Sequence, residues 1–213
     1  MGWFLRIFFD LLYHQFAWSY DWVSASVSLG KWNQWVSKVL PYIKAGRTLE
    51  LGYGPGHLQS ELLKKGFITF GLDASPQMSR QAMYHLRNKG FQPNLLRGFA
   101  QTLPFSNNTF QFVVSTFPSE YIVDPLTLSE IERVLEPGGQ AIILALAWIT
   151  GKKWSEKAAG NLFRITGQSP EWEDRFLEPV TNAGFQARVD WVGLESSRLA
   201  IIVAQKMEKK LLN

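Results

Sequence analysis

The sequence predicts a doubly wound α/β fold whose seven-stranded sheet is mostly parallel, with one antiparallel strand, preceded by N-terminal helices. Strand-like and helix-like segments alternate from residue 48 onward, and most of the strand-like segments are largely apolar. Such strands are typical of a parallel sheet that helices cover on both faces. The last two strand-like segments follow each other with no room for a helix between them, so they are expected to be antiparallel neighbours.

Local sequence patterns predict where the helices and strands begin and end. Apolar residues of the segment 32–43 follow the spacing of an amphipathic helix, which is expected to end within 41–45. Ser75-Pro76 and Asp124-Pro125 each place a capping side chain before a proline suited to the first helical turn. The expected strands are 48–51, 67–72, 94–97, 109–115, 140–147, 187–193 and 198–205. The expected helices between them are 56–65, 76–89 and 125–135. A further helix is expected to begin at 169–170 and to end before Gly184.

Composition excludes several kinds of site. The chain has 213 residues, 46% of them hydrophobic and 19% charged, which fits one folded domain with a large core. It contains no cysteine, so disulfides, thiolate nucleophiles and cysteine-ligated metals are ruled out. Its three histidines have no tight spacing, and no metal site is expected. The net charge of +4 is scattered along the chain, so no nucleic-acid partner is expected.

The first 44 residues form an aromatic-rich extension that is expected to be helical and to act as a lid, with the main domain at 45–213. Five of the nine tryptophans lie within the first 35 residues. Arg6, Asp10 and His14 interrupt the apolar run at helical spacing, which argues against a transmembrane span or a signal peptide. The polar stripe leaves two interpretations open: packing over the domain, or contact with a membrane surface. The protein is therefore expected in the cytoplasm, either free or peripheral at a membrane.

A glycine turn follows the first predicted strand. The turn Gly52-Tyr53-Gly54-Pro55-Gly56 lacks the dinucleotide spacing of glycines, because position 57 is histidine. Glu50 precedes it, and a carboxylate there suits a ligand with an ammonium group better than one with a pyrophosphate. Asp73 lies 23 residues after Glu50, at the end of the second strand, where it can accept hydrogen bonds from a ribose diol. An amine-bearing nucleoside without phosphates fits this pattern, and S-adenosylmethionine is such a ligand.

With these motifs the sequence resembles the class I S-adenosylmethionine-dependent methyltransferases over about residues 45–206. The segment 48–56 matches the first motif of the family and 71–75 the second, while 103–105, Phe110 and 130–139 match segments around the third to fifth strands. The resemblance implies a Rossmann-like methyltransferase fold, S-adenosylmethionine as cofactor and S-adenosylhomocysteine as product.

The resemblance also implies a role for individual residues. Phe99 stands where many relatives have an aspartate that contacts the adenine amino group, so adenine recognition there is expected to use packing and backbone contacts. The other implied cofactor residues are Glu50, Gly52, Gly54 and Gly56 for the methionine part, Asp73 for the ribose, Ala74, Met78, Ala100 and Gln101 for the adenine, and Thr116 and Phe117 near the transferred methyl group.

The N-terminal segment is similar to the start of the ubiquinone/menaquinone C-methyltransferase family. Tyr20-Asp21, Ser28-Leu29-Gly30 and Trp35 keep the order and spacing of that family, although Ser24 replaces its asparagine and its C-terminal motif is not evident. This resemblance implies methyl transfer to a small hydrophobic or aromatic acceptor, either quinone-like or lipid-like. It also implies that Tyr20 covers the cofactor.

Methylation of a phenolic acceptor would use a general base, for which the sequence leaves several candidates open. They are Tyr20, His14, His57, Glu120 and Tyr121. His57 begins the helix after the glycine turn, where the helix dipole disfavours a protonated imidazole. A second hypothesis is a non-catalytic methyltransferase-fold subunit of a larger or membrane-associated assembly, with the aromatic N-terminus as its interface.

Overall fold

The computed structural model describes residues 31–44, 46–150 and 172–208. The strands are β1 (Arg47–Leu51), β2 (Ile68–Asp73), β3 (Asn94–Arg97), β4 (Phe110–Thr116), β5 (Leu135–Ile149), β6 (Phe185–Leu194) and β7 (Ser197–Lys206). The α-helices are α3 (Trp32–Val36), α4 (His57–Lys64), α5 (Pro76–Asn88), α6 (Pro125–Val134) and α8 (Trp172–Asn182), and the 3₁₀ helices are η2 (Ser37–Tyr42) and η3 (Glu120–Val123).

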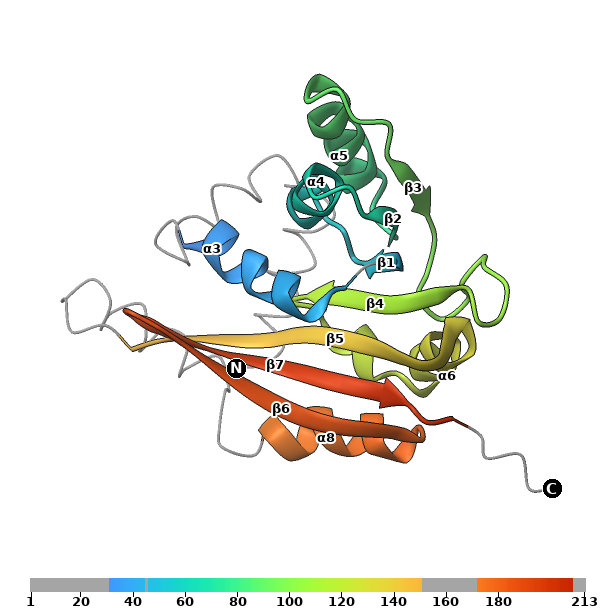
Figure 1. Cartoon of the computed structure of the whole chain (residues 1–213), viewed down its shortest axis with the longest axis vertical. Coiled ribbons are helices and arrows are strands. Elements are labelled where there is room, and N and C mark those ends of the chain that lie inside the picture. The colour runs from blue at the N-terminus through green and yellow to red at the C-terminus, as the bar shows by residue number, and fades with distance from the viewer. Residues whose placement is uncertain (1–30, 45, 151–171, 209–213) are drawn as a thin grey trace.

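The seven strands form one sheet in the order β3-β2-β1-β4-β5-β7-β6 (Figure 1). Neighbours from β3 to β5 pair in parallel, whereas β7 is antiparallel to both β5 and β6. A single reversed strand therefore completes an otherwise parallel sheet, which confirms the predicted fold class. The chain builds β1, β2 and β3 in one direction and then returns to place β4 on the other side of β1.

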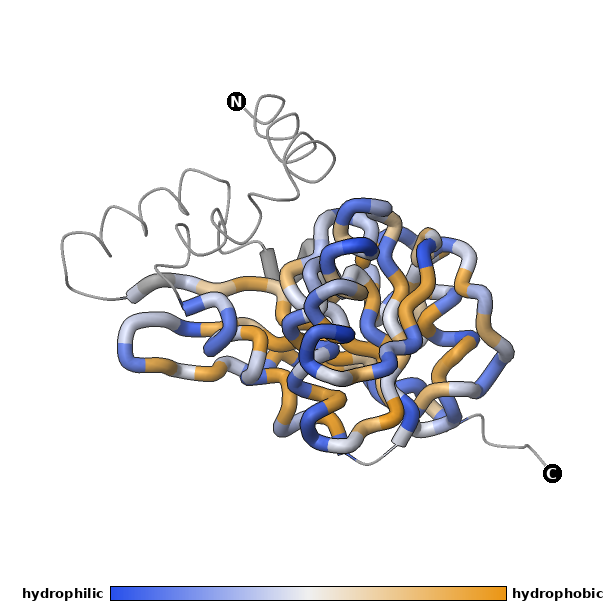
Figure 2. The backbone as a smooth tube through the Cα atoms, turned by 90° about the horizontal axis from the view of Figure 1, so that it is seen from above, coloured by the Kyte–Doolittle hydropathy of each residue, from blue (hydrophilic) through white to orange (hydrophobic). Residues whose placement is uncertain are grey.

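Helices cover both faces of this sheet, and adjacent strand residues alternate between the two resulting cores. Val114 and Ile142 pack with residues of α3, η2 and α4 on one face. Val113 and Ile143 pack with residues of η3, α6 and α8 on the other. In Figure 2 the hydrophobic stretches gather within the body of the domain and hydrophilic stretches dominate its outer turns. Residues 31–44, part of the expected extension, pack directly on the sheet.

The two cap-and-proline signals are confirmed. The Ser75 hydroxyl accepts a hydrogen bond from the Met78 N–H at 3.3 Å, and the Asp124 carboxylate accepts one from the Leu126 N–H at 2.9 Å. Each side chain satisfies an amide in the first helical turn that has no partner within the helix. The helix start expected at residues 169–170 lies outside the described residues, which contain α8 from Trp172 onward.

Two element predictions are wrong in detail. The segment expected as one α-helix is a short α3 followed by η2, because Pro41 has no N–H to donate and its ring crowds the carbonyl four residues earlier. Residues 137–139, expected to separate a helix from the fifth strand, instead lie within β5. Leu135 already pairs with Phe110, and Gln140 pairs with Phe112, so the residues between them form an irregularity in the strand.

No helix among the described segments is both long and apolar enough to cross a membrane.

Candidate functional site

The candidate site lies at the carboxyl ends of β1 and β4, where the strand order reverses. Ligands bind to open α/β sheets at this position, because the loops on the two sides diverge and leave a crevice. The structure brings the turn after β1 and the end of β4 together here. A cavity between them is lined by Trp32, Val36, Glu50, Gly52, Tyr53, Gly54, Pro55, His57, Leu58 and Thr116.

The cavity is narrow. Its volume is about 20 Å³, which is room for a single water-sized group, so it can take only a thin part of a larger ligand. A more open depression of about 540 Å³ lies elsewhere, against Arg87, Gln92, Pro93 and Asn94. That depression adjoins the amino end of β3, away from the strand ends at which ligands of this fold bind.

The glycine turn adopts a backbone that other residues would strain. Gly52, Gly54 and Gly56 have φ angles of 71°, 52° and 86°. A Cβ on Gly52 would lie 2.7 Å from the Tyr121 hydroxyl, and one on Gly56 would lie 3.1 Å from the Ala82 Cβ. Glycine is therefore required for the turn angle and for the close approach of η3 and α5.

Glu50 is the most unusual polar residue of the site. Its side chain is 1% exposed, and its Oε2 atom has no hydrogen-bond partner among the described residues. Burial raises the pKa of Glu50 well above its ordinary value, and a hydrogen bond from Gln59 only partly opposes this shift. An acceptor that is buried, lines a cavity and lacks a partner fits a ligand that brings a cation with N–H donors.

Asp73 links the glycine turn to the loop after β2. Its Oδ2 atom accepts a hydrogen bond from the Gly54 N–H at 2.8 Å, and its Oδ1 atom accepts one from the Ser75 N–H at 2.8 Å. Burial raises the pKa of Asp73, and these two bonds oppose the rise. The carboxylate is thus fixed beside the turn, and its remaining lone pairs can accept bonds from a diol.

The expected adenine-side residues surround the turn after β3. The Gly98 N–H donates to the Asp73 carbonyl at 3.0 Å, which places this turn next to Asp73. Phe99 is 67% exposed, whereas Ala100 is buried. The Gln101 amide donates to the Asp124 carboxylate at 3.1 Å. Of the two expected residues from the second motif, Ala74 is exposed and Met78 is fully buried.

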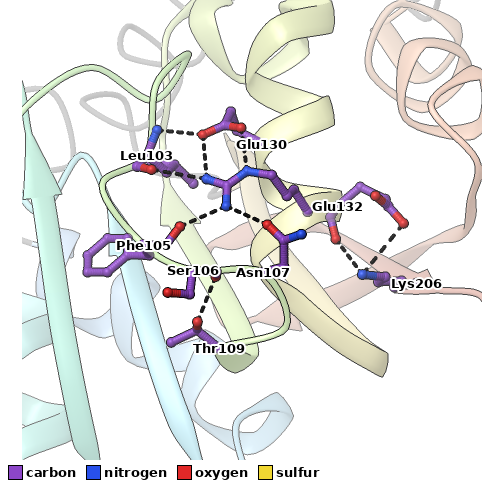
Figure 3. Close-up of polar contacts among 9 residues, drawn as sticks. Leu103, Phe105, Ser106, Asn107, Thr109, Glu130, Glu132 and Lys206 are labelled. Carbon is purple, nitrogen blue, oxygen red and sulfur yellow. Dashed lines mark hydrogen bonds and ion pairs between the residues drawn. The ribbon is translucent and has the colours of Figure 1, made fainter.

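An ion pair between Glu130 and Arg133 holds residues 103–107, the loop that follows the adenine-side turn (Figure 3). Glu130 accepts the Leu103 N–H at 2.6 Å, and Arg133 donates to the Leu103 and Phe105 carbonyls at 3.0 and 2.7 Å. The Arg133 hydrogen bond lowers the pKa of Glu130. The two charged residues thereby fix the 103–107 loop to α6, and with it the end of the adenine-side turn.

The end of β4 supplies the residues expected near the transferred methyl group. Thr116 lines the cavity, and Phe117 follows it with a φ of 51°. The Tyr121 hydroxyl lies 3.2 Å from the Leu51 carbonyl, to which it donates, and 3.1 Å from the Ser115 hydroxyl. Tyr121 therefore supports the backbone that enters the glycine turn. Its predicted role as a base stays untested.

The other predicted bases are differently placed. His57 lines the cavity, whereas Glu120 is exposed on η3. Tyr20 and His14 lie outside the described residues. The described residues contain no group of three or more histidine, aspartate or glutamate side chains that could hold a metal ion.

Among the cavity-lining residues that the sequence did not assign to the site are Trp32 and Val36 of α3. They were recognised only as part of an amphipathic helix. The concentration of tryptophan near the N-terminus was the available signal, but it did not indicate which aromatic side chain would reach the site.

Comparison with known proteins identifies the domain. Residues 49–143 match the family model described as a methyltransferase domain. The ubiquinone/menaquinone biosynthesis C-methyltransferase of Blochmanniella floridana is 33% identical over 150 residues, which cover 66% of this chain and 59% of that protein. The demethylmenaquinone methyltransferase of Bacillus subtilis is 32% identical over 134 residues, covering 59% of this chain and 58% of that protein. The chain thus spans about six tenths of the length of these curated relatives.

Solved structures show the same fold. The phosphoethanolamine N-methyltransferase 2 of Haemonchus contortus, in complex with S-adenosylmethionine, has a TM-score of 0.64 at 17% identity, covering 93% of this chain and 60% of that chain. An S-adenosylmethionine-dependent methyltransferase of Methanosarcina mazei has a TM-score of 0.58 at 22% identity, covering 81% and 98%. Residues 49–143 of the chain thus match a methyltransferase domain, and the chain resembles the class I S-adenosylmethionine-dependent methyltransferases, among them the ubiquinone/menaquinone C-methyltransferases.

Proposed function

We propose that the protein is an S-adenosylmethionine-dependent methyltransferase that acts on a small hydrophobic or aromatic acceptor of the quinone type. The observation that carries the proposal is the buried Glu50 carboxylate, whose Oε2 atom has no hydrogen-bond partner among the described residues, in a cavity lined by the glycine turn and by Trp32 of α3. Glu50 can bind the ammonium group of the cofactor, and Trp32 offers an aromatic surface to the acceptor. A methyl-transfer site needs both kinds of group.

Each part of the site has a distinct task in binding the cofactor. When bound, S-adenosylmethionine supplies a methyl group on a sulfonium centre. Glu50 would accept hydrogen bonds from its ammonium group, and Asp73 would accept them from the ribose hydroxyls. Because the cavity is narrow, the adenosine part would lie along the open rim formed by the turns after β2 and β3, beside Phe99.

The acceptor is proposed from two independent considerations. The relatives described above act, by their names, in quinone biosynthesis or on demethylmenaquinone. In this chain the residues that line the cavity also include Trp32, Val36 and Leu58, which offer apolar surface and no charge. Such a wall favours an apolar acceptor and helps to exclude water from the reacting groups. Contact with a membrane through the N-terminal segment would bring the protein to such acceptors, but that segment lies outside the described residues.

Calorimetric binding of S-adenosylhomocysteine tests the proposal, with NADH as the control ligand. Saturable binding of the first ligand alone is expected. Asp73→Ala should weaken it by about tenfold or more, because hydrogen bonds to a charged group contribute about 1.5–3 kcal/mol. Asp190→Asn is the matched control, since Asp190 pairs with Arg188 on β6, outside the cavity. Failure of the folded wild-type protein to bind would refute the proposal and favour a non-catalytic subunit.

A further inference from the structure

The Glu50 carboxylate has a buried polar neighbour on α4, the helix that follows the glycine turn and packs on β2 (Figure 1). Gln59 of this helix is fully buried, and its amide donates a hydrogen bond to Glu50. Glu50 pairs with Gly71 across β1 and β2, and a Cβ on Gly71 would lie 3.3 Å from the Gln59 Nε2 atom. The amide of Gln59 therefore lies close to this pair of residues, where glycine leaves room for it.

Three groups hold the Gln59 amide. Its Oε1 atom accepts a hydrogen bond from the Thr69 hydroxyl at 3.0 Å, and its Nε2 atom donates to the Phe70 carbonyl at 3.1 Å. An amide nitrogen has two N–H donors, so one remains for Glu50. Gln59 and Thr69 are both shielded from solvent, which makes each of these bonds costly to leave unmade. The Gln59 side chain thus has a partner for its oxygen and for both of its N–H groups.

The same contacts fix which end of the amide faces Glu50. If the oxygen and nitrogen of Gln59 exchanged places, the oxygen would meet the Phe70 carbonyl and the Glu50 carboxylate, which are both acceptors. Two acceptors with no donor between them repel, and a buried acceptor without a donor is unfavourable. The Thr69 hydroxyl adds to this preference, because it donates to the oxygen in its present position. Gln59 is therefore held with a donor toward Glu50.

The bond from Gln59 makes the two oxygens of the Glu50 carboxylate unequal. Oε2 has no hydrogen-bond partner among the described residues, so Gln59 serves the other oxygen. A donor stabilises the charged form of a carboxyl group, and this bond opposes the rise in the pKa of Glu50 that burial causes. A charged carboxylate accepts a stronger hydrogen bond from an ammonium group than a neutral carboxyl does. One oxygen is thus supported by the protein, and the other is left for a ligand.

We infer that Gln59 is a positioning residue of the cofactor site, which supports one oxygen of Glu50 so that the other can accept the ammonium group of the cofactor, and that Thr69 orients the Gln59 amide. Gln59 acts through Glu50, because it is not among the residues that line the cavity. The inference rests on the proposed function and adds two buried residues, one from α4 and one from β2, to those on which binding of the amino-acid part of the cofactor depends.

Calorimetric binding of two ligands tests the inference: S-adenosylhomocysteine, which carries the ammonium group, and methylthioadenosine, which lacks the amino-acid part. Gln59→Met keeps the length of the side chain and removes its amide. It should weaken S-adenosylhomocysteine about threefold to tenfold, the scale of one hydrogen bond, and leave the affinity for methylthioadenosine within about twofold. Thr69→Val should weaken S-adenosylhomocysteine alone, by about twofold to threefold. Thr69→Ser should restore that affinity, because serine keeps the hydroxyl.

Thr48→Val is the matched control. Thr48 pairs with Thr69 across β1 and β2 and is also buried, but its hydroxyl has no hydrogen-bond partner among the described residues, so its loss should change neither affinity. If a folded Gln59→Met variant binds S-adenosylhomocysteine as the wild type does, or loses affinity for both ligands equally, the inference is wrong and the proposed function stands. If Gln59→Met does not fold, a Thr69→Val variant with unchanged affinity for S-adenosylhomocysteine would overturn the inference instead. Failure of S-adenosylhomocysteine to bind the wild type would refute the proposed function and the inference with it.

Discussion

Replacing Glu50 by glutamine should stabilise the ligand-free protein and weaken cofactor binding at the same time. The wild-type Glu50 is 1% exposed, and one of its carboxylate oxygens has no partner in the part of the chain that the structure describes. A buried unsatisfied polar group costs about 1–3 kcal/mol, more if it is charged. Glutamine keeps a polar amide there, so we expect a net gain of about 1 kcal/mol. For a chain of this size that raises the melting temperature by about 2–4 °C. Loss of a charge-assisted hydrogen bond should weaken S-adenosylhomocysteine about 10- to 150-fold.

The pH dependence of the free energy of unfolding provides a second test of the Glu50→Gln prediction. Burial raises the pKa of Glu50, so between its ordinary and its raised pKa the folded protein holds a proton that the unfolded chain has lost. Through that window the contribution of Glu50 to stability falls as pH rises. Glu50→Gln should remove this contribution, and the difference in melting temperature between the variant and the wild type should grow with pH.

Thermal unfolding followed by circular dichroism across pH, combined with calorimetric titration, measures both effects. Glu61→Gln on α4 is the control, because the Glu61 side chain is 42% exposed and its pair with Lys64 is a surface ion pair of little energetic value. It should change neither quantity. A Glu50→Gln variant that melts below the wild type, or that binds S-adenosylhomocysteine equally well, would refute the assignment of Glu50 as the unpaired acceptor for the ammonium.

Three further changes test other parts of the structure. Glu130→Gln should lower the free energy of unfolding by about 1–2 kcal/mol at neutral pH. This difference from the wild type should disappear when unfolding is measured at a pH below the lowered pKa of Glu130, because the wild-type carboxyl is then protonated as well. Gly52→Ala should weaken S-adenosylhomocysteine at least about tenfold in calorimetry, because its Cβ would meet the Tyr121 hydroxyl at 2.7 Å in a strained backbone. Trp35→Phe should lower stability by about 1 kcal/mol in urea unfolding through loss of the Ser197 hydrogen bond; unchanged midpoints would contradict this.

The sequence predicted the features that depend on local chemistry. The glycine turn, the Glu50 carboxylate before it and Asp73 at the end of β2 follow from residue types at fixed short spacings. The two caps at Ser75 and Asp124 are confirmed for the same reason, since each hydrogen bond spans only two or three residues. The apolar strands were enough to predict the parallel sheet, because burial on both faces leaves few other arrangements.

Features that depend on long-range packing could not be predicted in this way. Tyr121 was placed correctly near the end of β4, but only the structure shows that its hydroxyl donates to the Leu51 carbonyl, 70 residues earlier. Helical spacing placed Trp32 and Val36 on one apolar face without indicating that this face closes the cavity. Similarly, helical spacing alone did not show that Ser37–Tyr42 is a 3₁₀ helix, in which Pro41 has no N–H to donate and Val39 is buried in the core.

The hydrogen bond between Trp35 and Ser197 joins positions 162 residues apart. During synthesis on the ribosome, α3 emerges early, but its anchor on β7 appears only when nearly the whole domain has been made. The wall of the cavity that Trp32 provides must therefore be the last part of the site to assemble, long after the glycine turn and Asp73 have left the exit tunnel. A ribosome-bound chain halted before β7 would already contain Glu50 and Asp73, yet it would lack the Ser197 anchor of the helix that carries Trp32. Because the chain is made from its N-terminus onward, the glycine turn with Asp73 and the Trp32 wall of the cavity are completed at different times.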